Sequence, residues 1–366
     1  MEHGKPPSSS RTLDLRSRYM QGRPGQLVAP DSFAASNVRL SPAKYSYEGD
    51  WLFCSFKDAE WRAARIGFGR GKLDWTDYGV DDLPIADNAL FWRVELIGRQ
   101  GIYAFVSSDP SQGDGLASNE ATLQVKFEQS GERLFQIEGW PDARWEFQSP
   151  GGALQVRLQV QPQKLAVWPD FVMPNNTFSM CLGSCRLGGT MVVEGGRQAV
   201  EGWGVFDHPR IVVEKNAVPP FGWYLYAPLC FSCGTQVISY YSQDGLGSKD
   251  RHYSMGFVTD TQGTAHWLTD HRVTQLKVGE SDLPLSWSAE LTGEEASVSY
   301  QARILDVPMI RGWGNANLPG KGKYPGYPLL MEAEGECRIR GHRRKLENGG
   351  GICEFLVRKN LQPRYP

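Results

Sequence analysis

Short runs of alternating apolar and polar residues, separated by turn signals, extend along most of the chain. The clearest run is Leu154-Gln-Val-Arg-Leu-Gln-Val160, whose strict alternation is typical of a strand with one buried face. Ser130-Gly131 and Pro150-Gly-Gly152 are turn signals at hairpin spacing. No amphipathic helical pattern of about 12 residues interrupts the runs. The pattern therefore predicts an all-β chain, a sandwich or barrel with very little helix.

The runs divide the chain into two halves of about seven to ten short strands each. The strands predicted in the first half are residues 51–56, 63–68, 91–97, 101–106, 121–127, 133–138, 145–147 and 154–160. Those predicted in the second half are residues 185–193, 200–208, 221–227, 235–241, 253–258, 265–268, 286–291, 296–302, 330–339 and 351–357.

Proline and glycine mark the expected boundaries between these parts. Residues 1–40 carry few periodic apolar positions and predict a flexible leader. We expect an N-terminal β domain at residues 41–165, a proline-containing link near residues 161–176 and a C-terminal β domain at residues 175–366. Residues 303–329, rich in glycine and proline, predict a long loop that could serve as a lid.

The stretch Val200-Glu-Gly-Trp-Gly-Val-Phe-Asp-His208 sets glycines between bulky residues and ends in an acid and an imidazole. Successive side chains of an extended strand point to opposite faces. Trp203 and Asp207 should therefore share one face, and His208 should lie on the other. A glycine inside a strand often marks a bulge, a barrel bend or the close approach of a ligand.

Composition excludes several classes of function. The 366 residues include 39 basic and 41 acidic side chains, which gives a net charge of −2. The chain therefore lacks the excess of positive charge that is typical of proteins that bind nucleic acid or an anionic membrane. No stretch approaches the roughly 20 apolar residues of a transmembrane helix, and Met1–Arg18 lacks the apolar core of a secretory signal. Seven thinly spread cysteines are typical of free thiols in a reducing compartment, so we expect a cytoplasmic protein.

Several motifs, in order, resemble those of a known superfamily. Gly189-Thr190 and the run ending in Asp207-His208 resemble a strand–turn–strand of the carotenoid 1,2-hydratase-like (AttH-like) lipocalins, in which a glycine-rich run ends in the same acid–His pair. Gly222-Trp-Tyr-Leu-Tyr226 fits the next strand, and residues 331–341 with Gly350-Gly-Ile-Cys-Glu-Phe355 are similar to the closing hairpin. The resemblance covers residues 180–357, while the first half matches only in the spacing of its predicted strands.

Two departures from the family pattern concern the chemistry more than the fold. Pro209-Arg210 stands where the family commonly has Trp-Gly, and the closing segment lacks the usual tyrosine. The resemblance still implies two lipocalin-like antiparallel β-barrel domains that form a cavity for an apolar substrate. It implies hydration of isoprenoid double bonds, or Diels–Alder and other pericyclic cyclisation of polyene natural products, without a cofactor or a metal.

Asp207, His208 and Tyr226 are the predicted catalytic residues. An acid with a raised pKa could protonate a double bond or donate a hydrogen bond to a carbonyl, and aromatic walls could hold a polyene in its reactive conformer. The predicted wall residues, all aromatic, are Trp203, Trp223, Tyr224, Tyr240, Trp51, Trp267 and Trp313. The structural alternative is that Asp207 accepts loop N–H groups, His208 is a satisfied barrel-end residue and the aromatics fill the core.

Two other clusters allow chemistry and have structural alternatives. Asp270-His271, with His252 and His266, could form a three-histidine metal site, although the spacing gives no carboxylate support for it. Cys230-Phe-Ser-Cys233 is a lone C-x-x-C motif, and Cys181 and Cys185 lack any paired histidine. Small buried thiols are therefore favoured over a zinc or redox site.

These observations predict a cofactor-independent cyclase or isomerase of secondary metabolism, whose partner is a hydrophobic polyene, polyketide or terpenoid substrate. A hydratase acting on the same substrates is the nearest alternative, and a non-catalytic lipid or pigment carrier is the next. A carbohydrate-active protein is a more distant alternative, suggested by the carboxylates Asp74, Asp77, Asp81, Asp82 and Asp87. The sequence leaves the oligomeric state open between a monomer and a weak dimer.

Overall fold

The structure, a computed structural model, places its strands in two large sheets. It describes residues 11–18, 26–32, 47–57, 60–71, 89–99, 101–109, 115–119, 124–173, 176–213, 221–244, 252–279, 284–305, 310–314 and 329–357. Within these ranges the helical elements are two short 3-10 turns, η1 (Pro30–Ser32) and η5 (Pro150–Gly152). The prediction of an all-β chain with very little helix is confirmed.

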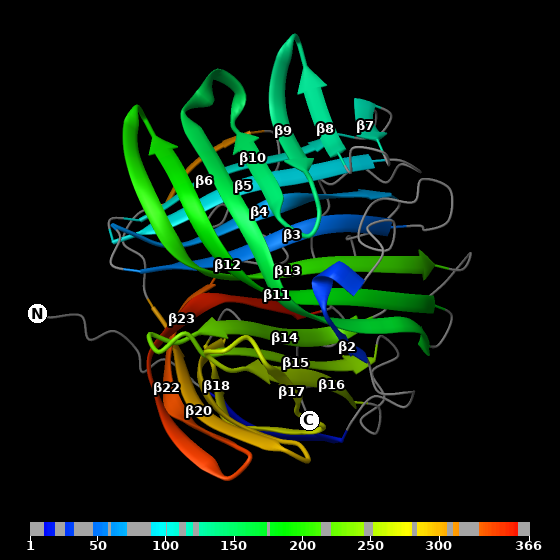
Figure 1. Ribbon diagram of the computed structural model, residues 1–366, viewed down its shortest axis with the longest axis vertical. Coiled ribbons are helices and arrows are strands. Elements are labelled where there is room, and N and C mark those ends of the chain that lie inside the picture. Colours follow the sequence, from blue (N-terminus) through cyan, green and yellow to red (C-terminus); the bar gives the residue numbers. More distant parts are fainter. Residues whose placement is uncertain are drawn as a thin grey trace, which may run out of the picture.

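The first sheet has 13 strands and curls around one hydrophobic core (Figure 1). In spatial order its strands are β21 (Ile310–Gly314), β6 (Ile102–Asp109), β5 (Ala89–Gly98), β4 (Trp61–Gly71), β3 (Tyr47–Phe56), β13 (Gly196–Val213), β12 (Asn176–Val193), β11 (Leu154–Met173), β10 (Ala143–Gln148), β9 (Glu132–Glu138), β8 (Gln124–Gln129) and β7 (Leu116–Asn119), with β2 (Gln26–Val28) paired to β11. The pairings are antiparallel except for β21, which runs parallel to β6.

The second sheet has 10 strands and encloses a second core (Figure 1). Its strands, in spatial order, are β1 (Arg11–Arg18), β18 (Asp270–Val278), β19 (Pro284–Thr292), β20 (Ala296–Ile304), β22 (Leu329–Ile339), β23 (His342–Val357), β14 (Phe221–Cys230), β15 (Gln236–Asp244), β16 (His252–Thr259) and β17 (Ala265–Trp267). The two curled sheets make two lipocalin-like halves, as the resemblance implied.

The change from one sheet to the other comes later in the chain than the sequence indicated. The stretch 161–176, expected as a link, is instead the end of β11 and its hairpin with β12, which pair from Leu154–Val193 to Met173–Asn176. The register shifts beside Pro162, so a bulge accommodates the residue that has no N–H to donate. Residues 176–213 therefore belong to the first sheet, although they were expected in the C-terminal domain.

Two other expectations also change. Residues 11–18, within the stretch expected as a flexible leader, pair with β18, and residues 26–28 pair with β11. Residues 310–314, within the stretch expected as a long loop, pair with β6. In each case a strand that is distant in the sequence supplies the backbone hydrogen-bond partners, and the local sequence pattern of a Gly- and Pro-rich segment does not show such a partner.

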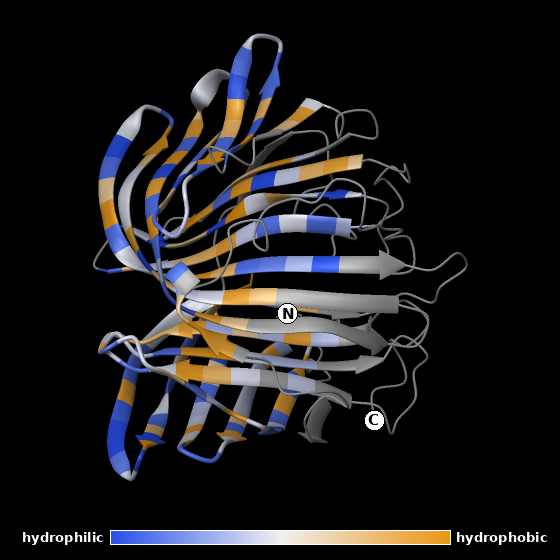
Figure 2. Ribbon diagram, turned by 45° about the vertical axis from the view of Figure 1, so that its right-hand side comes forward, coloured by the Kyte–Doolittle hydropathy of each residue, from blue (hydrophilic) through white to orange (hydrophobic). Residues whose placement is uncertain are grey.

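Apolar and polar residues alternate along many of the strands, as the colours in Figure 2 show, and the buried apolar residues form three clusters. In β11 the apolar residues of the 154–160 run are buried and Arg157 and Gln159 are exposed, as predicted. A stack of Phe68, Phe135 and Phe147 is part of the first core. A third cluster lies between the sheets, where β14 and β23 pack against β3 and β4. We call it the inter-sheet core; it includes Trp51, Phe53, Val205, Tyr226, Tyr240 and Ile352.

Candidate active site

Asp207 and His208 point to opposite sides of the first sheet. Strand β13 lies between β12 and β3, with Asp207 opposite Leu182 and Trp51. Val205, on the face that Asp207 shares, belongs to the inter-sheet core, whereas Phe206 belongs to the core inside the first sheet. The His208 ring stacks on Phe206, with centroids 6.2 Å apart. The predicted division of faces is therefore correct, and the two residues do not form a catalytic pair.

Asp207 is a buried carboxylic acid with an unsatisfied oxygen. Only 8% of the residue is exposed, and its Oδ1 has no hydrogen-bond partner among the described residues. Burial raises the pKa of Asp207 well above its ordinary value, and the charges of Glu354 and Asp50 raise it further. The raised pKa favours the protonated form of Asp207, in which the carboxyl group can donate a hydrogen bond.

An arginine joins the two sheets beside this acid. Arg65 of β4 is fully buried and pairs with Glu95 of β5 and with Glu354 of β23. Arg93 lies 3.6 Å from the other oxygen of Glu95. Two guanidinium groups, of Arg65 and Arg93, thus face the two carboxyl groups of Glu95 and Glu354. Pairing of opposite charges offsets part of the cost of burying them.

Tyrosines from the second sheet complete the cluster. Tyr226 lies opposite both Glu354 and Tyr240 in the sheet register, and its ring packs edge-on against Phe53 at 5.2 Å. Its hydroxyl has no hydrogen-bond partner among the described residues. Burial raises the pKa of Tyr226, and Asp207 and Glu354 add to the shift. Tyr226 is therefore a second neutral donor beside Asp207.

Tyr224 and Tyr240 form an aromatic wall next to these donors. Their rings stack with centroids 5.7 Å apart. The Tyr224 hydroxyl donates to Glu354 at 3.3 Å, which adds to the ion pair with Arg65 in stabilising the Glu354 carboxylate.

Trp51 forms the corresponding wall on the first sheet. Its indole N–H donates to the Tyr47 hydroxyl at 3.2 Å, and the Arg93 guanidinium lies 5.2 Å from its ring centre. Gly67 permits this arrangement, because a Cβ at that position would lie 2.8 Å from the Trp51 ring. Tyr47 and Phe91, at the same end of the interface, are half-buried.

His208 belongs to a different ionic pair, inside the first sheet. Its Nδ1 lies 2.6 Å from Asp50 Oδ1, and both side chains are buried. The contact orients the ring, while His208 Nε2 has no hydrogen-bond partner among the described residues.

The remaining predicted wall residues lie away from Asp207. Trp203 is half-buried in a cleft at the other end of the interface, and Trp267 packs edge-on against Phe257 at the border of the inter-sheet core. The side chains of Trp223 and Trp313 lie outside the described residues, as do the five aspartates at positions 74–87. The structure thus brings together Asp207, Tyr226, Tyr224, Tyr240 and Trp51 from the predicted set.

The second acid–histidine cluster does not form a metal site among the described side chains. His266 pairs with Glu295 at 3.0 Å, whereas His271 bonds to Ser239 at 2.9 Å inside the second sheet. The described residues contain no group of three or more metal-ligating side chains, and the side chain of His252 lies outside them. Burial lowers the pKa of His271 to about 4, so it is a neutral structural residue.

The seven cysteines are free thiols, as expected. Six are buried and Cys233 alone is exposed. Burial raises the pKa of Cys185 to about 12, which makes it unreactive at neutral pH. No helix among the described residues has the length and apolar character to cross a membrane.

Comparison with known proteins agrees with the architecture. No family model matches the chain, and a search of curated proteins finds no match. A solved structure from Nitrosomonas europaea, provisionally assigned as AttH, is similar at 13% identity over 87% of this chain and 98% of that chain, with a TM-score of 0.54. This chain has the AttH-like fold. The predicted resemblance is confirmed at that level.

Two structures of CghA also match with lower scores. One, with Sch210972, is 13% identical and covers 95% of this chain and 99% of that chain; the other is 12% identical and covers 95% and 98%. Both have a TM-score of 0.44.

Sequence analysis missed the charged half of the cluster. Arg65, Arg93 and Glu95 each interrupt an otherwise apolar predicted strand, and a charge at such a position is rarely buried without a partner. That signal was present in the sequence. Glu354 likewise interrupts the apolar predicted strand 351–357, but its partner Arg65 lies 289 residues away in the chain, so the sequence did not show that the two meet.

Proposed function

We propose that the protein is a cofactor-independent cyclase or isomerase that acts on a hydrophobic polyene at the inter-sheet cluster. The observation that carries this proposal is the buried Asp207, whose Oδ1 lacks a partner among the described residues and whose pKa is raised by burial. With Tyr226 it offers two uncharged donors to an activating carbonyl of the substrate. The walls of Trp51, Tyr224 and Tyr240 would restrict the polyene to a folded conformer and so reduce the entropic barrier.

Pericyclic ring closure needs no proton transfer. Bonds are exchanged within the substrate while the carbonyl oxygen accepts hydrogen bonds from Asp207 and Tyr226. The donors stabilise the negative charge that develops on that oxygen, and the low dielectric of the buried site strengthens the effect.

A hydratase is the second candidate, and the different environments of Asp207 and Glu354 favour it. Burial raises the pKa of Asp207, whereas Glu354 is held in an ion pair with Arg65, and two carboxyl groups in such different environments are suited to acid and base roles. Asp207 would give its proton to a double bond, water would attack the resulting cation, and Glu354 would take the proton that the water releases. The net change is addition of one water molecule, after which solvent restores both protonation states.

Synthetic linear polyenes that carry a conjugated diene and an unsaturated carbonyl test both candidates. Each is incubated with the protein in heavy-oxygen water and in deuterium oxide, and products are followed by mass spectrometry. A cyclised isomer without label, formed faster than in buffer, supports the cyclase; a product with heavy oxygen and carbon-bound deuterium supports the hydratase. Polyenes that bind tightly and return unchanged would support the carrier instead.

The Asp207→Asn variant separates the two mechanisms further. An asparagine still donates a hydrogen bond but cannot transfer a proton at neutral pH. We expect a cyclase to lose roughly tenfold to a hundredfold in rate, whereas a hydratase should lose all detectable activity. Binding without turnover in both proteins would overturn the enzymatic proposal.

A further inference from the structure

A cleft of about 650 Å³ opens on the outer face of the first sheet, at the end of the interface opposite Asp207. Its floor is formed by β11, β12 and β13, where Gln161, Arg186 and Trp203 occupy one row across the strands. Gln159, Gly188 and Glu201 occupy an adjacent row. The turns that follow β14 and β16 contribute Cys233, Gly234 and Thr261 to the opposite rim. The inter-sheet cluster does not use this cleft, although Trp203, one of the predicted wall residues, lines it.

The lining of the cleft carries two basic side chains, Lys57 and Arg186, against one carboxylate, Glu201, so an excess of positive charge remains. Lys57 lies over the Trp203 ring at 4.2 Å, and neither Lys57 nor Arg186 has an ion-pair partner among the described residues. At the rim, Arg344 donates to the Thr261 hydroxyl at 3.2 Å. Glu201 is the one carboxylate among the side chains that line the cleft. The charge therefore favours an anionic ligand.

The neutral lining narrows the class of anion. Gln159, Gln161 and Gln163 present both amide donors and carbonyl acceptors, and Glu201 adds further acceptors. A bare phosphate or carboxylate has no hydrogen to give to these acceptors. Sugar hydroxyls both donate and accept, and flat amide, carboxylate and guanidinium groups can each bind two neighbouring hydroxyls. The indole of Trp203 supplies the apolar surface that a sugar ring also needs.

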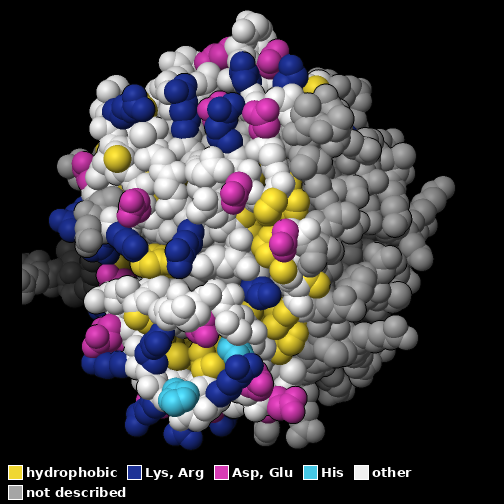
Figure 3. Space-filling model, viewed as in Figure 1, with side chains coloured by type: hydrophobic (Ala, Val, Ile, Leu, Met, Phe, Trp, Pro, Cys, Tyr) yellow, Lys and Arg dark blue, Asp and Glu magenta, His cyan; other side chains and the backbone are white. Residues whose placement is uncertain are grey.

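We propose that this cleft binds an acidic saccharide, with Arg186 and Lys57 holding the carboxylate and the glutamines holding the hydroxyls. The volume lies within the range usual for small-ligand sites. Figure 3 shows basic side chains and small hydrophobic patches interspersed on the face seen in that view, rather than one extended apolar surface. The proposal is independent of the chemistry at Asp207.

Cys233 gives a direct measurement of occupancy, because it is the one exposed cysteine and it lines the cleft. The rate of its alkylation by iodoacetamide is measured by mass spectrometry, with and without a trisaccharide of galacturonate. We expect millimolar trisaccharide to slow the reaction at least several-fold in the unmodified protein. The neutral trisaccharide maltotriose should protect at least tenfold more weakly.

Two variants test the geometry. A Cβ at Gly188 would meet nothing within 4 Å, so Gly188→Val should fill the cleft floor without disturbing the sheet and should abolish protection. Arg186→Gln should weaken protection about tenfold, whereas Arg338→Gln, which alters an exposed strand arginine in the second sheet, should not. Circular dichroism and thermal unfolding confirm that each variant is folded, and Gly188→Ala replaces Gly188→Val if the latter is not.

The proposal is supported if protection of Cys233 requires the acid groups of the sugar, is lost in Gly188→Val and is weakened in Arg186→Gln. No protection in the unmodified protein overturns it. Equal protection in Gly188→Val also overturns it, because the sugar would then bind elsewhere. Equal protection by maltotriose overturns the assignment of an acidic ligand.

Discussion

Arg65 of the first sheet and Glu354 of the second form an ion pair across the interface, and the same guanidinium also pairs with Glu95. The pair connects two strands, β4 and β23, that are far apart in the chain. It stabilises Glu354 as a carboxylate, whose charge in turn helps to keep Asp207 protonated. Packing of the sheets and protonation of the proposed acid therefore depend on the same contact.

Replacement of Arg65 by methionine should destabilise the protein by about 3–5 kcal/mol, because Glu95 and Glu354 lose their shared cation in a buried site. The control is Arg62→Met, which removes a pair between Arg62 and Glu332 whose side chains are 43% and 38% exposed. That change should cost less than about 1 kcal/mol. Urea unfolding measures both, and equal effects would contradict a structural role for the interface pair.

Asp207 should make the protein less stable as pH rises. The unfolded chain releases this proton near pH 4, whereas the folded protein retains it because burial and Glu354 raise the pKa. The free energy of unfolding should therefore fall from about pH 4 up to the raised pKa. Asp207→Asn should remove this fall, while the exposed Asp142→Asn should not. Parallel curves of unfolding free energy against pH for Asp207→Asn and the unmodified protein would contradict the assignment.

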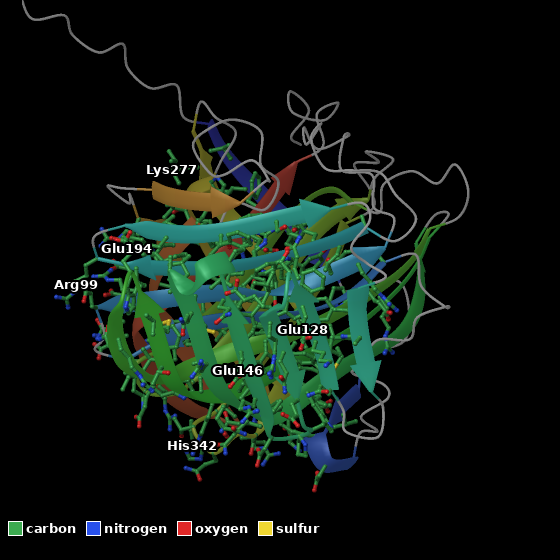
Figure 4. The ribbon with its side chains drawn as sticks, turned by 90° about the horizontal axis from the view of Figure 1, so that it is seen from above. Arg99, Glu128, Glu146, Glu194, Lys277 and His342 are labelled. Carbon is green, nitrogen blue, oxygen red and sulfur yellow. The ribbon has the colours of Figure 1, made fainter. Side chains whose placement is uncertain are left out.

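His271 should contribute the opposite dependence. Its pKa is about 4 in the folded protein, against about 6.5 in an unfolded chain. The unfolded state binds the proton first, so stability should be lost progressively as pH falls from about 6.5 to about 4, by roughly 3 kcal/mol in total. His271→Gln should remove that loss. His342, which is exposed at the end of a hairpin (Figure 4), is the matched control, and replacing it by glutamine should leave the pH dependence unchanged.

Gly67 and Gly188 should respond differently to alanine. At Gly67 the backbone φ is +152°, and a Cβ would lie 2.3 Å from the carbonyl oxygen of Asp50. Gly67→Ala should therefore cost more than about 2 kcal/mol and displace Trp51 from the cluster. Gly188→Ala meets open space and should change stability by less than about 0.5 kcal/mol. Thermal unfolding and the near-ultraviolet spectrum of the tryptophans check both expectations.

Tyr226→Phe should separate activity from stability. The hydroxyl has no hydrogen-bond partner among the described residues, and the ring contact with Phe53 would remain. Removing an unsatisfied buried hydroxyl should leave the free energy of unfolding unchanged or slightly raised. The rate of polyene cyclisation should fall roughly tenfold, since one of two donors is lost. A large loss of stability would show that the hydroxyl has a structural partner.

Much of the local structure could be predicted from the sequence. The alternation at residues 154–160 indicated a strand with one buried face. The predicted strand at residues 200–208 placed Asp207 and His208 on opposite faces. The structure agrees with both predictions. The link expected at residues 161–176 was wrong, because proline in a sequence pattern does not show that a bulge can accept it.

The sequence by itself determined the β architecture and the face on which each strand side chain lies, because a pleated backbone alternates its side chains whatever the surrounding fold. Only the tertiary structure decided that Arg65 pairs with Glu354 and that the charge of Glu354 acts on the buried Asp207, and hence that the pKa of Asp207 is raised. Burial and the charges of distant residues set that proton affinity, and both arise when two curled sheets pack together.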